Sequence, residues 1–180
     1  MPPTQLSHVV FQTNQKKEMQ EWYREVLGGH VVYENAHLAF MTYDDEHHRV
    51  AFADLGPLAA RAPGSDLAVS PSDTPGLHHV AFTFGSMGEL LANYTRLAAG
   101  GIRPFRSIDH GPTTSMYYMD PDGNRVELLV DNFSSVEEAR AWMESPTFAQ
   151  NPMGVDFDPD EHVRKFDSDV AAAELVLRDA

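Results

Sequence analysis

The most informative residues of the sequence are two histidines that an internal repeat places at equivalent positions. LSHVVF, residues 6–11, returns 71 positions later as LHHVAF, residues 77–82. This offset aligns His8 with His79, whereas His78 aligns with a serine. Side chains alternate between the two faces of a strand, so His8 and His79 should project to the same face of their sheets.

A second repeat adds a carboxylate. HRVAFAD, residues 48–54, returns 76 positions later as NRVELLV, which aligns Glu127 with Ala51. A glutamate inside a strand is rarely buried without a partner, because burying an unpaired charge is costly. Two histidines and one carboxylate on a divalent ion leave its other positions open for water, substrate and O₂, as in non-haem Fe(II) oxygenases.

Each of these residues also has an ordinary interpretation. A single histidine in a strand is more often hydrogen-bonded in the core or exposed than a ligand, and a single strand glutamate is usually solvated. The repeat favours a metal site, because all three side chains fall on equivalent positions of two modules. His8, His79 and Glu127 are therefore the predicted metal ligands.

The elements that must position these side chains repeat in the same order. Residues 15–29 and 86–101 have apolar residues at close to helical spacing and end in two glycines, which predicts two helices with glycine caps. Three strand-like runs follow each helix, at 30–34, 37–43 and 48–54, and at 102–108, 114–119 and 124–130. The sequence therefore predicts one α+β domain, residues 1–180, in which paired βαβββ modules, 5–56 and 76–131, form a metal-centred cavity.

Two segments lie outside these modules. Residues 57–75 are rich in proline, glycine, alanine and serine, which is typical of a linker. Residues 132–180 form an acidic tail with helical signals, and we expect it to pack across the modules. Ser135 opens a capping box before a helix through Trp142, and Asp158, followed by proline, predicts the start of a second helix.

The composition narrows the classes of function. The chain has no cysteine, so any metal must use His, Asp or Glu side chains. Its net charge of −14 argues against nucleic acid or an anionic membrane surface as a partner. The sequence has no signal-peptide pattern and no apolar run near the ~20 residues of a membrane span. We therefore expect a cytoplasmic protein. Because sheet-forming modules of this kind often dimerise or assemble further, we also expect a homo-oligomer.

The segment that leads to Glu127 carries a more specific motif. From Ile108 the sequence satisfies in full the pattern [GNTIV]-x-H-x(5,7)-[LIVMF]-Y-x(2)-[DENTA]-P-x-[GP]-x(2,3)-E. The match begins with IDH, residues 108–110, and continues after five residues with MYYM, residues 116–119. DPDG, residues 120–123, follows directly, and three residues later comes Glu127. Through this motif, residues 5–131 resemble the vicinal oxygen chelate superfamily. Within it they resemble one-domain type I extradiol ring-cleavage dioxygenases.

The resemblance implies a site, residue by residue. The implied ligands of Fe(II), or of Mn(II), are His8, His79 and Glu127. The implied catalytic residues are His48 as the acid–base histidine, and His110 and Tyr117 as contacts of bound oxygen and of the substrate hydroxyls. Glyoxalase-like relatives often carry a fourth ligand near the position of Ala51, so an alanine there favours an oxygenase over an isomerase.

Without the motif, the catalytic residues would have simpler interpretations. His48 could be an exposed hairpin histidine, His110 a loop residue without a role, and Tyr117 a packed aromatic. By strand alternation, we expect His47 to point away from His48, and Tyr118 to lie in the core. The remaining histidines have no support from repeat or motif and are expected on the surface: His30, His37 and His162.

The prediction is a metal-dependent extradiol dioxygenase that cleaves the aromatic ring of a catechol-type substrate with O₂. One alternative is a glyoxalase-like isomerase or a thiol transferase of the same fold. Another is a non-catalytic drug-binding protein, for which the acidic charge would suit a cationic ligand. Such a binder would lack the metal triad.

Overall fold

The computed structural model describes residues 2–58, 75–168 and 170–176. The chain divides into two compact units, and each is described by itself. The first unit comprises residues 1–65 together with 120–124, and the second comprises 66–119 and 125–180. Most of the predicted linker lies outside the described residues. None of the described helices has the length and apolar character that crossing a membrane requires.

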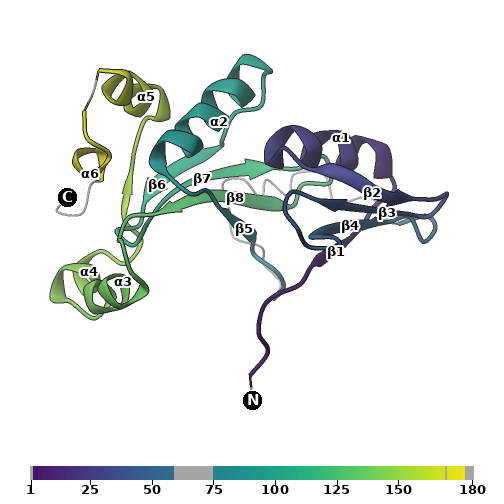
Figure 1. Cartoon of the computed structure of the whole chain (residues 1–180), viewed down its shortest axis with the longest axis horizontal. Coiled ribbons are helices and arrows are strands. Elements are labelled where there is room, and N and C mark those ends of the chain that lie inside the picture. The colour runs from purple at the N-terminus through teal and green to yellow at the C-terminus, as the bar shows by residue number, and fades with distance from the viewer. Residues whose placement is uncertain (1, 59–74, 169, 177–180) are drawn as a thin grey trace. The chain divides into compact units, whose positions relative to one another are not determined.

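The first unit is a four-stranded sheet with one helix on one of its faces (Figure 1). Its elements are β1 (Val9–Gln12), α1 (Lys16–Leu27), β2 (His30–Glu34), β3 (Leu38–Thr42) and β4 (Val50–Ala53). The strand order is β1-β4-β3-β2, with β1 parallel to β4 and the other pairs antiparallel. The predicted βαβββ order is confirmed.

The helix α1 is held on its sheet by one apolar stripe. Met19, Tyr23 and Val26 are buried, at the spacing that brings residues to one face of a helix. The Tyr23 ring packs 5.1 Å from Phe52 of β4, measured between ring centroids. The helix ends at Gly28, whose left-handed backbone, with φ of 68°, donates its N–H to the carbonyl of Arg24.

The second unit repeats this plan and extends it. Its sheet contains β5 (Val80–Thr83), β6 (Arg106–Asp109), β7 (Thr113–Met119), β8 (Arg125–Asp131) and β9 (Val155–Asp156), in the order β5-β8-β7-β6-β9. The helix α2 (Met87–Ala99) follows β5, and its Ser86 cap accepts a hydrogen bond from the Glu89 N–H. The strand β9 comes from the tail and was not predicted.

The two parallel strand pairs share one register. Val10 lies opposite Ala51 in the first unit, and Ala81 lies opposite Glu127 in the second. Val10 and Ala81 are equivalent in the 71-residue repeat. The predicted equivalence of Ala51 and Glu127 is therefore confirmed at the level of backbone pairing.

The turn between β7 and β8 is anchored on α1. Asp120 is buried, and its carboxylate accepts hydrogen bonds from the N–H groups of Asp122 and Asn124 and from the Tyr23 hydroxyl. Burial raises the pKa of Asp120, although these hydrogen bonds oppose the rise. Gln15 donates to the carbonyl of Pro121 at 2.8 Å. A turn fixed in this way sets the register in which Tyr117 lies opposite Glu127.

The tail is mostly helical, as predicted, and adds four helices: α3 (Val136–Met143), α4 (Pro146–Gln150), α5 (Pro159–Asp167) and α6 (Ala172–Leu175). The predicted caps are present, because the side chains of Ser135 and Asp158 accept from the N–H groups of Glu138 and Asp160. The tail does not form a single layer, since α5 packs against α2 whereas α3 and α4 pair with each other.

The surface placement predicted for His162 is wrong. Only 4% of the residue is exposed, and its ring packs 4.1 Å from that of Phe157. Its Nε2 lies 3.1 Å from the carbonyl oxygen of Leu175. Burial follows from the position of His162 on α5, which the short helix α6 covers. His30 and His37 are exposed, as predicted.

A polar cluster fastens α5 to α2. The Tyr94 hydroxyl donates to the carboxylate of Asp160 at 2.6 Å and accepts from the Arg103 guanidinium at 2.8 Å. Burial, and then Asp160, raise the pKa of Tyr94 to about 12.

Tyr94→Phe should lower the free energy of unfolding by about 1 kcal/mol at neutral pH, because it removes this hydrogen bond. As the pH rises from 10 to about 12, an unfolded Tyr94 loses its proton while the folded one keeps it. The wild type therefore loses stability over this range, and the Phe variant lacks this loss. Urea titrations across that range should show the two proteins converging; a constant difference would contradict the assignment.

Candidate metal centre and active site

The second unit brings a predicted pair of ligands together. His79 directly precedes β5, and Glu127 lies on β8, the parallel neighbour of that strand. His79 Nε2 lies 2.9 Å from Glu127 Oε2, and only 5% of Glu127 is exposed. An imidazole nitrogen and a carboxylate oxygen that converge in this way suit a divalent ion such as Fe(II), Mn(II) or Zn(II).

A chain of hydrogen bonds continues from this pair. The Tyr117 hydroxyl donates to the other oxygen of Glu127, Oε1, at 2.9 Å. His110 Nε2 lies 3.0 Å from the same hydroxyl. Burial, followed by the negative charge of Glu127, raises the pKa of Tyr117 above its usual value, so the hydroxyl keeps its proton. His79, Glu127, Tyr117 and His110 therefore form one continuous polar cluster.

The loop that carries His110 is fixed by its own hydrogen bonds. Asp109, almost fully buried, accepts from the Gly111 N–H at 2.7 Å and from the Asn132 amide at 3.2 Å. Asn132 also donates to the carbonyl of Gly111 and accepts from the Thr114 hydroxyl. A buried carboxylate with several donors holds its loop in one geometry, so His110 has a defined position.

The first unit contains a second cluster of predicted residues. His8 directly precedes β1, and its ring stacks on His48 with 4.3 Å between centroids. The ring of Phe40 also stacks on His48, at 4.7 Å. Burial, and then the nearby His8 and His47, lower the pKa of His48. The predicted acid–base histidine therefore contacts a predicted ligand.

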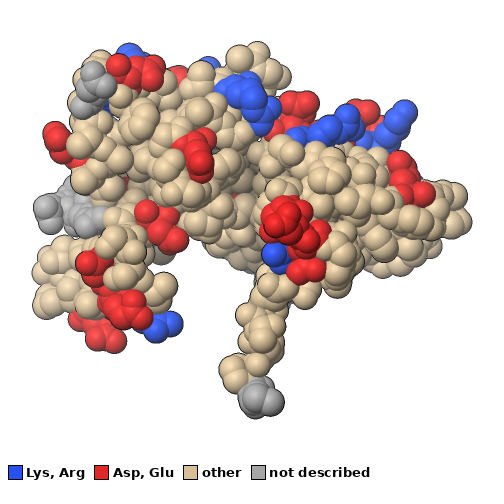
Figure 2. Space-filling model, in the orientation of Figure 1, with Lys and Arg blue, Asp and Glu red and all other residues tan. Residues whose placement is uncertain are grey.

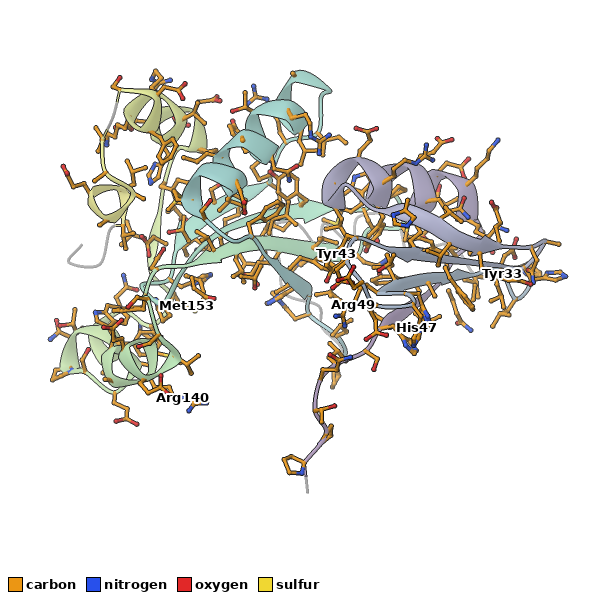
Figure 3. All side chains as sticks on the ribbon, in the orientation of Figure 1. Tyr33, Tyr43, His47, Arg49, Arg140 and Met153 are labelled. Atoms are coloured by element: carbon orange, nitrogen blue, oxygen red, sulfur yellow. The ribbon has the colours of Figure 1, made fainter. Side chains whose placement is uncertain are left out.

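One expectation about this cluster is wrong in part. His47 is exposed, as a solvent-facing residue should be, but it does not point away from His48: the two rings lie 4.5 Å apart, and the two Nδ1 atoms lie 2.5 Å apart. Alternation of side chains fails here because β4 begins only at Val50, so both histidines lie in the loop before it. Figure 3 labels His47 and Arg49 in this loop. Tyr118 is buried in the core, as predicted.

The six predicted site residues thus fall into two clusters, His8 with His48 in the first unit and His79, Glu127, Tyr117 and His110 in the second. Within either unit, the described part of the chain holds no group of three or more His, Cys, Asp or Glu side chains arranged for a metal ion. The second unit supplies two predicted ligands, and the predicted set takes His8 as its third.

Sequence reasoning missed several groups that support the second cluster. Asp109 and Asn132 brace the His110 loop, and the carbonyl of Met153 accepts from His110 Nδ1 at 2.8 Å. The short spacing from Asp109 to Gly111 is a signal for a turn with a side-chain acceptor. A backbone carbonyl in a distant tail has no signal in residue types.

Known proteins can be compared with this arrangement. The pattern of the glyoxalase/bleomycin resistance protein/dioxygenase superfamily matches residues 5–128, which is more than half of the chain. The chain belongs to this superfamily.

Two curated members of the superfamily come from Rhodococcus globerulus. The chain is 50% identical to biphenyl-2,3-diol 1,2-dioxygenase 2 over 153 residues, which cover 85% of this chain and 76% of that protein. It is 44% identical to biphenyl-2,3-diol 1,2-dioxygenase 3 over 173 residues, covering 96% and 87%.

Two solved structures are similar to this chain at lower sequence identity. Lactoylglutathione lyase from Agrobacterium tumefaciens matches with a TM-score of 0.55 at 21% identity, covering 72% of this chain and 96% of that one. The fosfomycin resistance protein FosX from Listeria monocytogenes matches with a TM-score of 0.53 at 17% identity, covering 77% and 99%. These likenesses show the fold.

Tyr117→Phe should lower the free energy of unfolding by about 1–3 kcal/mol, because the buried Glu127 Oε1 would lose its donor. The neighbouring Tyr118→Phe is the matched control, since its hydroxyl contacts only the weak acceptor Met116 Sδ, at 3.7 Å. Urea unfolding of the metal-free proteins measures both. Equal losses in the two variants would argue against the contact between Tyr117 and Glu127.

Proposed function

We propose that this chain cleaves the aromatic ring of biphenyl-2,3-diol, or of a closely related catechol, with O₂. The observation that carries the proposal is the identity of half of the aligned residues with a dioxygenase named for that diol. The chain is an extradiol ring-cleaving dioxygenase of its superfamily, with a catechol-type substrate. The biphenyl skeleton is the finer part of the proposal.

The proposed ligands are His8, His79 and Glu127. The support for His79 and Glu127 is their separation of 2.9 Å and the burial of Glu127. The support for His8 is its equivalence to His79, since each directly precedes the strand that opens its module. When bound, Fe(II) holds the catechol and O₂ next to each other and lets charge pass between them. Mn(II) suits the same donor set.

His48 is the proposed base. A catechol must lose a proton from its second hydroxyl, and a histidine has the affinity for protons that this transfer needs near neutral pH. The ring of His48 stacks on His8, so in this proposal it lies beside the bound catechol. Stacking on Phe40 fixes the orientation of the ring from its other side.

Tyr117 and His110 are the proposed hydrogen-bonding partners of the substrate and of oxygen. The Tyr117 hydroxyl is oriented by Glu127 on one side and by His110 on the other. The hydroxyl has one proton, which Glu127 accepts in the protein alone, and this proton would become available to a substrate oxygen if the carboxylate bound a metal ion. His110 can in turn hold or return a proton through its Nε2 atom.

The alternative of an isomerase has weaker support. The likeness to lactoylglutathione lyase is at 21% identity and concerns the fold. Ala51, which is buried in β4, offers no side-chain ligand at the position equivalent to Glu127.

The test is O₂ uptake after anaerobic reconstitution with Fe(II), using catechol, 3-methylcatechol and biphenyl-2,3-diol. We expect one O₂ consumed per diol, a yellow ring-opened product, and the highest kcat/KM with biphenyl-2,3-diol. His79→Ala and Glu127→Ala should each lose metal binding and activity, which metal analysis and O₂ uptake measure separately. Turnover under argon, or full activity of either variant, would overturn the proposal.

His48→Phe should retain its metal and lose turnover by about 10²–10⁴-fold, because it removes the proton acceptor and keeps an aromatic ring against Phe40. His30→Phe is the control, since His30 is exposed and lies at the start of β2. Metal content and kcat are measured on the same preparations. Loss of metal from His48→Phe would instead identify His48 as a ligand.

A further inference from the structure

The tail returns to the sheet of the second unit through the turn at residues 151–154, which lies directly against the His110 loop. Figure 3 labels Met153 where the α3–α4 segment comes back to the sheet. We propose that this turn is a positioning element, in which the Met153 carbonyl fixes the His110 ring with a proton on Nδ1 and directs Nε2 toward Tyr117. The catalytic consequence rests on the proposed function, whereas the orientation of the ring does not.

The contact between His110 and the Met153 carbonyl fixes the position of a proton. His110 Nδ1 lies 2.8 Å from the Met153 carbonyl oxygen, and a carbonyl can only accept. Nδ1 must therefore carry a proton, which selects one of the two neutral tautomers of the ring. Nε2 is then the nitrogen that faces the Tyr117 hydroxyl, 3.0 Å away. In this neutral tautomer Nε2 carries no proton, so it is the ring nitrogen that can take one up, and it shares the single proton of the Tyr117 hydroxyl with Glu127 Oε1.

The backbones of the turn and of the His110 loop lie very close together. Gly154 has a φ of +88°, and a Cβ on it would lie 2.0 Å from the carbonyl oxygen of Asp109 and 2.7 Å from the Cα of His110. A side chain of any size is therefore excluded at this position. Immediately after the turn, Val155 pairs with Asp109 in the β6–β9 ladder, so the turn cannot shift along the loop.

The turn also holds its own shape. The Asn151 side chain donates to the carbonyl of Gly154 at 3.0 Å and accepts from the Gly154 N–H at 3.1 Å. These two bonds close the turn around Met153. The Met153 side chain is itself 60% exposed, so the carbonyl is the part of this residue that reaches the site.

A second contact joins the tail to the same loop. Gly111 has a φ of +89°, and a Cβ on it would lie 2.1 Å from the Trp142 ring of α3. Trp142 packs in turn on Phe133 and Phe148, with 6.1 Å and 5.4 Å between ring centroids. The tail therefore touches the His110 loop at Gly111 as well as at Gly154.

The extent of the tail in known proteins fits this role. The superfamily pattern ends at residue 128, so the turn lies outside the shared domain. The alignment with biphenyl-2,3-diol 1,2-dioxygenase 3 covers 96% of the chain, which it could not do without most of the tail. The positioning turn is thus an addition to the superfamily domain that lies within the alignment to a dioxygenase.

Gly154→Ala tests the proposal, with Gly101→Ala as the matched control. Gly101 has a similar φ of +85°, but a Cβ there would meet nothing within 4 Å, so the control carries the backbone strain without the displacement. Asn151→Ala is a milder second variant that opens the turn without a clash. Circular dichroism establishes that each variant is folded.

The direct readout is the tautomer of His110 in metal-free, ¹⁵N-histidine-labelled protein, by long-range proton–nitrogen NMR at a pH where the ring is neutral. The signal is assigned by its loss in His110→Asn. In the wild type and in Gly101→Ala, we expect the proton on Nδ1. In Gly154→Ala and Asn151→Ala, the tautomer with the proton on Nε2 should become more populated than the tautomer with the proton on Nδ1.

The second readout is kcat and KM for biphenyl-2,3-diol with Fe(II). We expect kcat to fall by about 10-fold in Gly154→Ala, with KM changed little, because the substrate contacts remain. If Gly154→Ala does not fold, Asn151→Ala decides the outcome alone. An Nδ1 proton retained in the folded variants would overturn the proposal. An Nδ1 proton in a wild type that consumes no diol would instead refute the proposed function and leave the positioning role intact.

Discussion

A carboxylate buried inside a sheet has to be partnered, and much of the second unit follows from the way Glu127 meets that need. One of its oxygens receives the Tyr117 hydroxyl and the other lies at His79 Nε2. Tyr117 lies on β7 and His79 directly precedes β5, and both of these strands are neighbours of β8. Strand pairing therefore brings both partners to the Glu127 carboxylate. A metal ion bound by His79 and Glu127 would take over part of the role that these contacts have in the protein alone.

The internal duplication makes the role of Glu127 sharper. Both units pair their parallel strands in the same register, yet one has a buried alanine where the other has a buried glutamate. The two units therefore share the same strand pairing, but only the second has an ionisable side chain at this position. Figure 2 shows a similar unevenness on the surface, where acidic side chains gather on the α3–α4 segment. The acidic charge of the chain therefore belongs partly to the tail.

The sequence predicts most of the fold and a set of candidate site residues, for identifiable reasons. Repeat offsets singled out His8, His79 and Glu127, because residues at equivalent positions of repeated strands project to the same face of their sheets, and the structure brings two of them, His79 and Glu127, together. The same rule failed for His47 and His48, which precede the strand and so escape its alternation. His162 was misjudged because its burial depends on α6, thirteen residues away and weakly patterned. The contact of the Met153 carbonyl with His110 could not be predicted, because every residue has a backbone carbonyl and only the folded structure determines which one meets the ring.

The anchoring of the β7–β8 turn on α1 has a consequence for the way the chain folds. Asp120 is bonded to Tyr23 and Pro121 to Gln15, contacts that span 97 and 106 residues of sequence. Contacts between such distant residues form late, because a long stretch of chain must first lose its freedom. The strands β7 and β8 are close in sequence and can pair locally, whereas the anchoring of their turn has to wait for the N-terminal helix. In a chain emerging from the ribosome the residues of that helix are made first, so the groups that anchor the turn are already present when the turn is synthesised.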